Sequence, residues 1–216
     1  MAAIKTKTKG ASRRGRPPAH EVESRNTKLL DAATEVLLEA GYTGAKMSLI
    51  AKKAGASMET LYARYPTKDA LFAALIERKA SGLLSVIGPL SPDREPLEAL
   101  TIFATQLVAM MSMPDTQKLH RLVIAGSIES PELGRLFWEA GPGRGFKIIA
   151  TYLEQQKVIG KLAVDDVNRD AGMLIGMLVG GIALRLNLGT PAMTQTAEEQ
   201  EAWASQTVRQ FLRLIS

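Results

Sequence analysis

Residues 57–64, with the sequence SMETLYAR, combine polar, charged and aromatic side chains in a segment too short to form a core helix. A hydroxyl at the position of Ser57 can cap a helix by accepting a backbone N–H two or three residues further on. Pro66 ends the segment, because the residue before a proline, Tyr65, is pushed away from helical geometry. The segment has few apolar residues, so its polar face and Tyr62 remain available to a partner.

The sequence predicts a second short helix immediately before this segment, over residues 48–54. The small side chain of Ala51 lets the two helices approach closely, and Gly55 can adopt the left-handed conformation that a tight turn needs. Leu61 would then close the small core between the two helices. The spacing of these residues predicts a helix-turn-helix, whose second helix lies in the major groove of DNA.

The charge of the chain is unevenly distributed. Residues 1–79 contain 15 Lys and Arg against 8 Asp and Glu, whereas residues 80–216 contain 12 against 14. A basic N-terminal third on a nearly neutral body indicates a polyanionic partner at one end of the molecule. A basic tail that only aids solubility is the alternative explanation.

The first 19 residues contain six Lys and Arg, no acidic residue and almost no apolar side chain. Such a segment cannot bury a core, so we expect a disordered arm. It ends in RRGRPP, and the narrow Gly-Arg-Pro sequence suits the minor groove, where Arg14 and Arg16 would meet the negative potential of A·T tracts. A plain basic tail remains an equal alternative.

The rest of the chain is predicted to be helical, so the fold class is all-α. Apolar residues recur at helical spacing from Glu21 to a natural stop at Gly41, and Thr67 is placed to cap a helix over residues 68–87. We expect further helices over residues 94–112, 115–128, 131–140, 143–157, 166–187 and 197–215. The 14 apolar residues from 171 to 184 are too few for the roughly 20 that span a bilayer, and predict a buried helix.

The segment LLDAATEVLLEAGYTGAKMSLIAKKAGASMETLYARYPTKDALFAAL resembles the DNA-binding domain of the TetR family of bacterial transcriptional regulators. The matching features are the paired alanines of the first helix, "GY", "IA..AG.S", "TLY", an aromatic residue at position 65 and "P.K.AL". The segment LHRLVIAGSIESPELGRLFWEAGPGRG is similar to the C-terminal domain of the AefR-like branch of that family. The resemblance implies three parts: a basic arm over 1–19, a DNA-binding domain over 20–79, and a regulatory and dimerisation domain over 80–216.

The resemblance also implies which side chains meet DNA. The helix that begins at Ser57 is the recognition helix, Tyr62 and Lys68 match phosphate contacts, and Tyr65 matches a position that packs inward. Phosphate contacts set affinity, while base contacts set sequence choice. The predicted DNA-binding residues are Arg14, Arg16, Lys28, Lys46, Ser48, Ser57, Met58, Glu59, Thr60, Tyr62, Arg64 and Lys68.

The sequence departs from the family pattern at several of these positions. Ala45 and Lys46 stand where threonine commonly caps the second helix, so Lys46 or Ser48 would supply the phosphate contact. Ala63 replaces a residue that is often larger. Glu59 would either accept a hydrogen bond from a cytosine amine or merely stabilise the first helical turn. The operator sequence therefore does not carry over from a relative.

In the family, the last two long helices form a four-helix dimer interface, which here covers residues 166–187 and 197–215. Gly172, Gly176 and Gly180 recur every four residues and form a face that another backbone can approach; packing within the same subunit is the alternative. The apolar contacts expected from the last helix are Trp203, Val208, Phe211, Leu212 and Ile215. We therefore expect a homodimer.

The family's C-terminal domain holds a small-molecule site among its central helices. Aromatic and methionine side chains on these helices would form it, although such stripes are often simple core, and methionine adapts to irregular ligands. His120 and Arg121 are polar groups on an otherwise apolar helix and would orient the ligand or serve a structural role. The candidates are Phe103, Leu107, Met110, Met111, Met113, His120, Arg121, Phe137, Trp138, Met173 and Met177. We expect an apolar or weakly anionic effector.

Several function classes lack support in the sequence. There is no cysteine, and His20 and His120 are far apart, so neither disulfides nor a His/Cys metal site is expected. No phosphate loop, dinucleotide fingerprint or nucleophile elbow is present, so we expect neither an enzyme nor a cofactor. The N-terminus lacks the apolar run of a secretory signal, which favours a cytoplasmic protein without membrane partners.

These observations together predict a homodimeric, ligand-responsive transcriptional regulator, a repressor that a small molecule releases from a near-palindromic operator on double-stranded DNA. Two alternatives remain. The chain could be a ligand-binding helical dimer with weak DNA binding, which Glu59, Ala45 and Ala63 would permit. It could also bind DNA without sequence preference through the arm.

Overall fold

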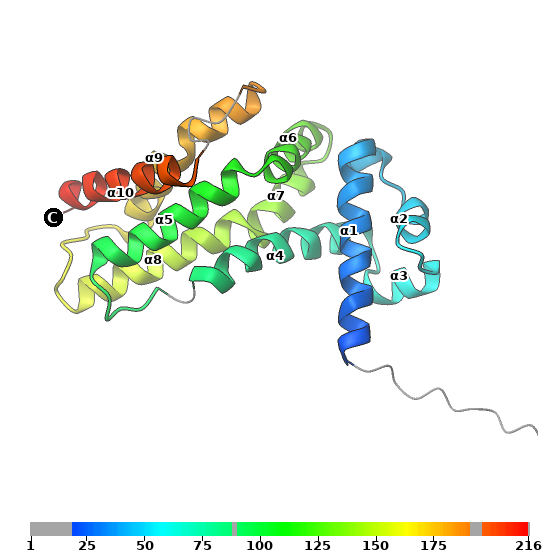
Figure 1. The fold of residues 1–216 in the computed structure, drawn as a ribbon, viewed down its shortest axis with the longest axis horizontal. Helices are drawn as coiled ribbons and strands as arrows, with labels where there is room; N and C mark the ends of the chain where they lie inside the picture. Colours follow the sequence, from blue (N-terminus) through cyan, green and yellow to red (C-terminus); the bar gives the residue numbers. More distant parts are fainter. Residues whose placement is uncertain (1–18, 88–89, 191–195, 216) are drawn as a thin grey trace, which may run out of the picture.

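A computed structural model describes residues 19–87, 90–190 and 196–215, and all regular structure in these ranges is α-helical (Figure 1). The all-α fold class is therefore confirmed. The chain forms α1 (Ala19–Gly44), α2 (Met47–Lys53), α3 (Met58–Arg64), α4 (Lys68–Ile87), α5 (Pro96–Ser112), α6 (Pro114–Glu129), α7 (Pro131–Ala140), α8 (Pro142–Val158), α9 (Val167–Asn187) and α10 (Ala197–Leu214). The predicted helices agree with these bounds to within about two residues.

The N-terminal helices α1, α2 and α3 lie together at one end of the molecule, with α4 leading from them into the larger body (Figure 1). α1 is interrupted at Gly41, whose φ of 71° is left-handed, so the predicted stop is confirmed. The hydroxyl of Thr67 accepts the N–H of Ala70 at 3.0 Å and caps α4, also as predicted. Leu37, Ile50, Leu61 and Phe72 fill the space between these helices and are almost fully buried.

The core of this N-terminal end does not stop at the predicted domain boundary after residue 79. Leu119 and Val123 of α6, with Leu133 and Ala140 of α7, are buried in the same cluster as the side chains of α1–α4. We call this cluster the N-terminal core. Because α6 packs against α1 and α7 against α4, a shift of either helix bears on the helices that share this core with α2 and α3.

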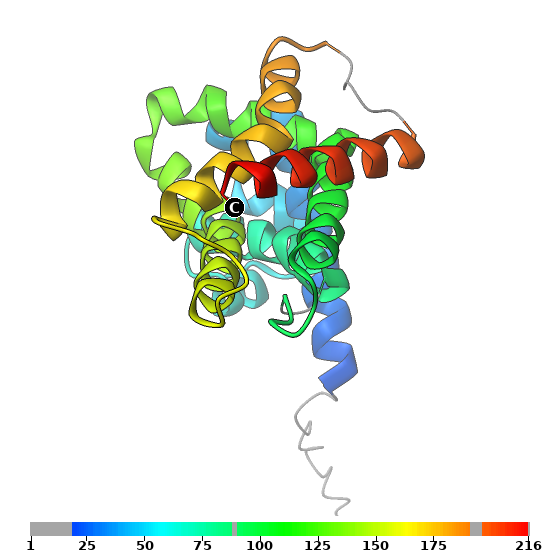
Figure 2. The same cartoon turned by 90° about the vertical axis from the view of Figure 1, so that its left-hand side faces the viewer.

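A second cluster holds the body together, and α5, α8, α9 and α10 supply most of it. Phe103, Tyr152, Leu178 and Phe211 are fully buried there. α10 crosses the end of the body, as Figure 2 shows, and a reciprocal capping box between Thr196 and Glu199 fixes its N-terminus. Val208 and Phe211 are buried within their own subunit and Ile215 is nearly so, which corrects the prediction that these residues supply dimer contacts.

α9, predicted to be a buried helix, is buried on one face only within this chain. One face, with Leu174, Leu178 and Ile182, is buried against the body, whereas Leu184 and Leu188 are 61% and 69% exposed. By length and composition α9 is the one helix among the described residues that could cross a membrane, a test that core helices of soluble proteins also pass. Its apolar character therefore exceeds what a single subunit buries.

Candidate nucleic-acid interface and effector cavity

The turn between α2 and α3 has the geometry that the sequence predicts. Gly55 has a φ of 63°, and the N–H of Ala56 reaches back to the carbonyl of Ala51 at 2.9 Å. A side chain with a β-carbon would be strained at Gly55, because left-handed backbone is costly for other residues. The side chain of Ser57 accepts the N–H of Thr60 at 3.1 Å and caps α3, and Leu61 is fully buried beneath it. The helix-turn-helix thus has a rigid, sequence-encoded shape.

The predicted DNA-contacting side chains that the structure describes lie mainly on one exposed surface. Met58 and Tyr62 are 38% and 45% exposed although both are large and apolar in part. The remaining exposed members of the set are Lys28, Lys46, Ser48, Ser57, Glu59, Thr60 and Arg64. Arg14 and Arg16 lie outside the described residues. These side chains are mostly polar and come from α2 and α3 and the residues that precede each helix, with Lys28 on α1.

Four residues of the predicted set are hydrogen-bonded within the chain: Ser57 and Thr60 to each other, Arg64 to Asn26, and Lys68 to Tyr42. The Nε of Arg64 donates to Oδ1 of Asn26 at 3.0 Å, and the hydroxyl of the buried Tyr65 donates to the same oxygen. Asn26 therefore ties the end of α3 to α1. The inward position of Tyr65 is confirmed.

Lys68 is held more firmly than the sequence suggests. Its Nζ donates to the carbonyl oxygen of Tyr42 at 2.7 Å and lies 4.4 Å from the centre of that residue's ring. The Tyr42 hydroxyl in turn donates to Asp69, and burial together with this carboxylate raises the pKa of Tyr42. An ammonium group has three donors, so Lys68 can reach a phosphate only with the donors that Tyr42 leaves free.

α2 begins without a side-chain cap. Lys46 occupies the N-cap position with an extended backbone and makes no capping hydrogen bond, and Ala45 beside it is buried. The unpaired N–H groups of the first turn of α2 are therefore open to an anion, and the positive charge of Lys46 lies next to them. Lys53 at the other end of α2 is instead paired with Glu35 and Glu39 of α1 at 2.8 and 2.9 Å.

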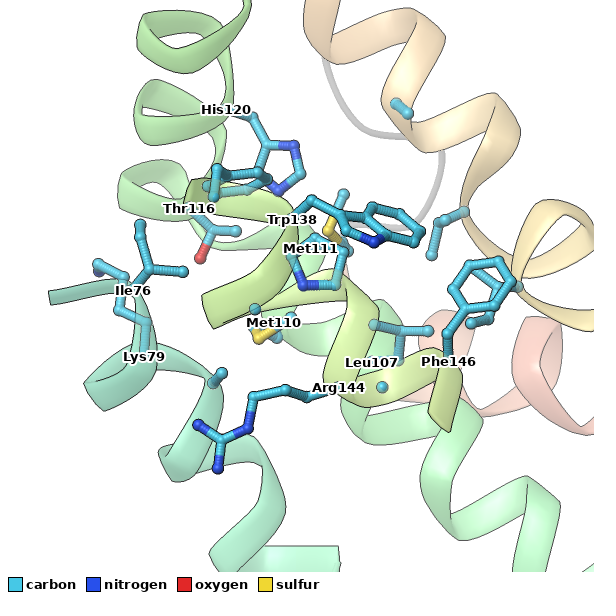
Figure 3. Close-up of a pocket in the computed structure, with 18 of the residues that line it drawn as sticks. Ile76, Lys79, Leu107, Met110, Met111, Thr116, His120, Trp138, Arg144 and Phe146 are labelled. Atoms are coloured by element: carbon cyan, nitrogen blue, oxygen red, sulfur yellow. The ribbon is translucent and has the colours of Figure 1, made fainter. Parts of the chain in front are cut away.

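The body contains a cavity of about 370 Å³ between α4–α9 (Figure 3). This volume lies in the range of small-molecule sites, and the walls are almost entirely apolar. Seven predicted residues line it: Phe103, Leu107, Met110, Met111, His120, Phe137 and Trp138. The other lining residues were not predicted from the sequence: Ile76, Lys79, Ala80, Thr116, Leu119, Gly141, Pro142, Arg144, Gly145, Phe146, Ile175, Val179 and Ala183.

Four of the predicted ligand contacts lie outside the cavity wall. Met173 and Met177 pack against the core of the body, and Arg121 donates to the carbonyl of Leu186 at 3.4 Å. Adjacent residues on a helix point in different directions, so Arg121 lies outside the cavity wall while His120, its neighbour on α6, lines it. Met113, between α5 and α6, is 55% exposed and does not line the cavity either.

His120 contributes a neutral polar group to the cavity wall. Its ring meets the ring of Phe137 edge to face, with centroids 4.9 Å apart. Burial lowers the pKa of His120 from its ordinary value of 6.5, so the imidazole is uncharged near neutral pH. The hydroxyl of Thr116 lies one helical turn away, and neither side chain has a hydrogen-bond partner within the described residues. Both are therefore available to a ligand.

The segment GPGRG, which the sequence analysis took only as a helix break, forms part of the cavity wall between α7 and α8. A β-carbon added at Gly141 would come within 2.9 Å of Ile76, and one at Gly143 within 3.0 Å of Trp138. Glycine thus allows the turn to lie close against α4 and α7. One sequence signal could have indicated this wall: a glycine-rich break between two helices that directly follows aromatic residues.

The three glycines of α9 do not share one environment. A β-carbon at Gly172 would meet Phe146 of the same chain at 3.3 Å, whereas nothing lies within 4 Å at Gly176 or Gly180. Gly172 therefore serves packing inside the subunit. Gly176 and Gly180 belong with Leu184 to an exposed, apolar row on α9.

An all-α chain with an exposed helix-turn-helix at one end and an apolar cavity in a helical body has the architecture of a helix-turn-helix transcriptional regulator. Residues 29–75 match the family described as bacterial regulatory proteins, tetR family. Residues 98–214, more than half of the chain, match the AefR-like transcriptional repressor C-terminal domain. The chain belongs to the TetR family of transcriptional regulators.

Solved structures agree with this assignment over most of the chain. A TetR-family regulator from Mesorhizobium loti is 29% identical, with a TM-score of 0.74, over 89% of this chain and 96% of that one. The flavonoid-responsive regulator FrrA is 30% identical, with a TM-score of 0.73, over 89% of this chain and 97% of that one. Members of the family bind DNA and small-molecule effectors and act as dimers.

A curated relative matches over a shorter segment. The transcriptional activator FasR of Mycolicibacterium smegmatis is 40% identical over 77 residues, which are 35% of this chain and 34% of FasR. The chain thus spans about a third of the length of that relative.

Proposed function

We propose that the protein is a homodimeric transcriptional repressor that binds a near-palindromic operator in the cytoplasm and is released by a small molecule held in the cavity. The observation that carries the proposal is that some residues belong both to the cavity wall and to the N-terminal core. Ile76 and Leu119 line the cavity and are also buried in the N-terminal core, and Phe137 lines it while packing against that core. An occupant of the cavity therefore contacts the helices that support the helix-turn-helix.

The exposed surface of α2 and α3 is the proposed operator-binding surface. Met58, Glu59 and Thr60 lie on the first turn of α3 and would face base edges, while Tyr62 and Lys46 would contact phosphates. So few base contacts per subunit give weak discrimination. Two subunits on a near-palindrome double the specific free energy, which favours a dimer.

The exposed row on α9 is the proposed centre of the dimer interface. Gly176 and Gly180 leave room for a partner helix to approach, and Leu184 and Leu188 offer apolar area that the subunit itself does not bury. Ile175, Val179 and Ala183 lie one position earlier along α9 and line the cavity. A single helix thus separates the effector from the proposed interface.

Effector binding would act by displacing α4, α6 and α7 against the N-terminal core. This movement would change the separation of the two recognition helices in a dimer and weaken operator binding. A coupling free energy of ~1–3 kcal/mol between the two sites is typical of such regulators. The apolar walls favour an apolar or weakly anionic effector, and the similarity to a flavonoid-responsive regulator is in keeping with a ligand of aromatic character.

Selection of bound duplexes from a random DNA pool, followed by titration at several salt concentrations, tests the proposal. We expect a near-palindromic motif whose binding is weakened by Tyr62→Ala and, uniformly across sequences, by removal of residues 1–19. Lys147→Gln is the matched control, because Lys147 is an exposed cation on α8 far from the helix-turn-helix. Equal binding of unrelated duplexes with a steep salt dependence would refute operator recognition.

Weak or nonspecific DNA binding is the second candidate. It is favoured by the carboxylate of Glu59 on the first turn of α3 and by the engagement of Lys68 with Tyr42. Under this alternative, Glu59→Gln would raise affinity for every duplex by a similar factor. If Glu59 instead reads a cytosine, the substitution would relax specificity at one base pair only.

A further inference from the structure

Two cations interrupt an otherwise apolar cavity wall. Lys79 comes from the middle of α4 and Arg144 from the first turn of α8, and none of the residues that line the cavity is acidic. In Figure 3 both lie toward one side of the cavity, while Leu107 and Phe146 lie toward the other. Arg144 is exposed and Lys79 is half-buried, so the charged groups are at the solvent-facing part of the wall.

The charge of these cations is only weakly compensated. Arg144 is 3.9 Å from Glu77 of α4, a long contact between side chains that are 43% and 59% exposed. Exposed pairs of this kind contribute little, because water screens them. Lys79 has no ion pair or hydrogen bond with any other described residue. Both groups therefore keep donors for an anion.

The rest of the cavity is rich in aromatic rings. Phe103, Phe137, Trp138 and Phe146 line it, and Trp138 and Phe146 already contact each other with centroids 5.3 Å apart. Ring stacking favours a flat aromatic body over a flexible chain of the same area. Thr116 and the neutral His120 add hydrogen-bonding groups but no charge.

We propose that the effector is an aromatic monocarboxylate whose rings occupy the apolar cavity and whose carboxylate is bound by Arg144 and Lys79, with Arg144 exchanging Glu77 for the ligand. The inference rests on the function proposed above and names the ligand class of that site. The guanidinium presents a pair of N–H donors whose geometry matches a carboxylate.

The exchange also has a regulatory consequence. The contact between Arg144 and Glu77 links α8 to α4, and α4 runs from the body into the N-terminal core. A ligand carboxylate that takes Arg144 away from Glu77 releases this link at the moment the cavity fills. Glu77 is thus a competitor of the ligand, and its removal strengthens ligand binding.

Isothermal titration calorimetry of the full chain, without DNA, tests the proposal with two matched pairs of probes. 2-Naphthoate and 2-naphthamide have the same rings and differ in charge, and octanoate and octanamide repeat the comparison with a flexible body. We expect 2-naphthoate to bind roughly tenfold more tightly than 2-naphthamide, the usual scale of a charge-assisted contact at a partly exposed site. Octanoate binds more weakly than 2-naphthoate if the aromatic walls select the body.

Three substitutions distinguish recognition of the ligand's carboxylate from recognition of its rings. Arg144→Gln and Lys79→Gln each lower 2-naphthoate affinity about threefold and leave 2-naphthamide unchanged. Glu77→Gln acts in the opposite direction and raises 2-naphthoate affinity severalfold. A merely structural role for these residues would alter both probes alike, so the charged and neutral probes control for misfolding.

Equal affinity for carboxylates and amides, or failure of every carboxylate to bind, overturns the inference. Equal loss of affinity for both probes in Arg144→Gln, or no gain in affinity in Glu77→Gln, also overturns it.

Release of the protein from operator DNA is measured separately. Release by the amide as strongly as by the carboxylate refutes the ligand class and leaves the proposed regulator intact. Selective carboxylate binding without any effect on DNA supports the ligand class and refutes the proposed release.

Discussion

The proposed operator-binding surface and the proposed effector cavity are built in opposite ways. Most of the surface comes from residues 46–64, and each of its side chains is set by a helix cap, a glycine turn or the buried Leu61 immediately beneath it. The cavity is concave and apolar, and its walls come from helices spread between residues 76 and 183. A local motif can be recognised along the chain, whereas a cavity exists only where distant helices fail to fill space.

The two regions also differ in what a substitution does. On the proposed operator-binding surface, neighbouring residues have separate roles: Leu61 is buried and supports the fold, whereas Tyr62 is exposed. In the cavity, Ile76 and Leu119 serve the wall and the N-terminal core together. Substitutions on the proposed operator-binding surface should therefore change either function or stability. Substitutions in the cavity should change both together.

The largest expected effect is a difference in stability between substitutions at two adjacent residues of α3. Leu61→Ala removes a fully buried side chain from the N-terminal core and should lower the free energy of unfolding by about 2–5 kcal/mol. Tyr62→Ala, at a position that is 45% exposed, should change it by less than about 0.5 kcal/mol but weaken operator binding. Urea denaturation and DNA titration of both variants check this, and similar stability losses would contradict the separation.

The next effect concerns the proposed dimer interface. Leu184→Glu introduces a charge on the exposed row of α9 and should convert the dimer to monomers at micromolar concentration, because an unpaired buried charge costs about 3–5 kcal/mol. Val158→Glu, at an exposed position at the end of α8, is the control. Sedimentation measures the mass of both. A Leu184→Glu dimer of undiminished stability would place the interface elsewhere.

A smaller effect tests whether the cavity receives the effector. Ala183 lines the cavity from α9, and Ala183→Phe would occupy part of its volume. We expect effector affinity to fall roughly tenfold, because the ligand loses about as much apolar burial as one or two methylene groups provide. Operator affinity should be unchanged. Ala163→Phe changes the same residue type at an exposed loop position and should have no effect. Equal effector affinities in the two variants would argue for another binding site.

The smallest effect concerns the pH dependence of stability. Burial lowers the pKa of His120 below its ordinary 6.5, so the unfolded chain binds more protons than the folded chain between the two values. The free energy of unfolding should therefore fall as the pH drops below about 6.5. His120→Asn should flatten this part of the profile, while His20 is common to both proteins. Identical profiles would show that His120 does not titrate differently on folding.

Much of the fold and of the DNA-binding surface was readable from the sequence. Helical periodicity and caps such as Ser57 and Thr67 act within a few residues, so the helix bounds and the turn at Gly55 follow from local chemistry. The inward position of Tyr65 came from the resemblance to the family. Its partner Asn26 lies far away in the chain and left no local signal.

The cavity shows where sequence reasoning ends. Periodicity places Phe103, Leu107 and Met110 on one face of a helix, but it does not say whether that face meets another helix or an empty space. Met173 and Met177 were equally good candidates and proved to be packing residues, whereas Lys79 and Arg144 gave no local sign of a ligand.

The sequence by itself determined the all-α class, the helix-turn-helix and the basic N-terminal third, because each depends on residue types at short spacing. Tertiary structure alone decided that α6 and α7 join the N-terminal core, that Gly172 packs inward while Gly176 and Gly180 stay open, and that two cations meet at one cavity. The physical reason is that packing depends on the relative positions of whole helices, which no short segment of the chain encodes.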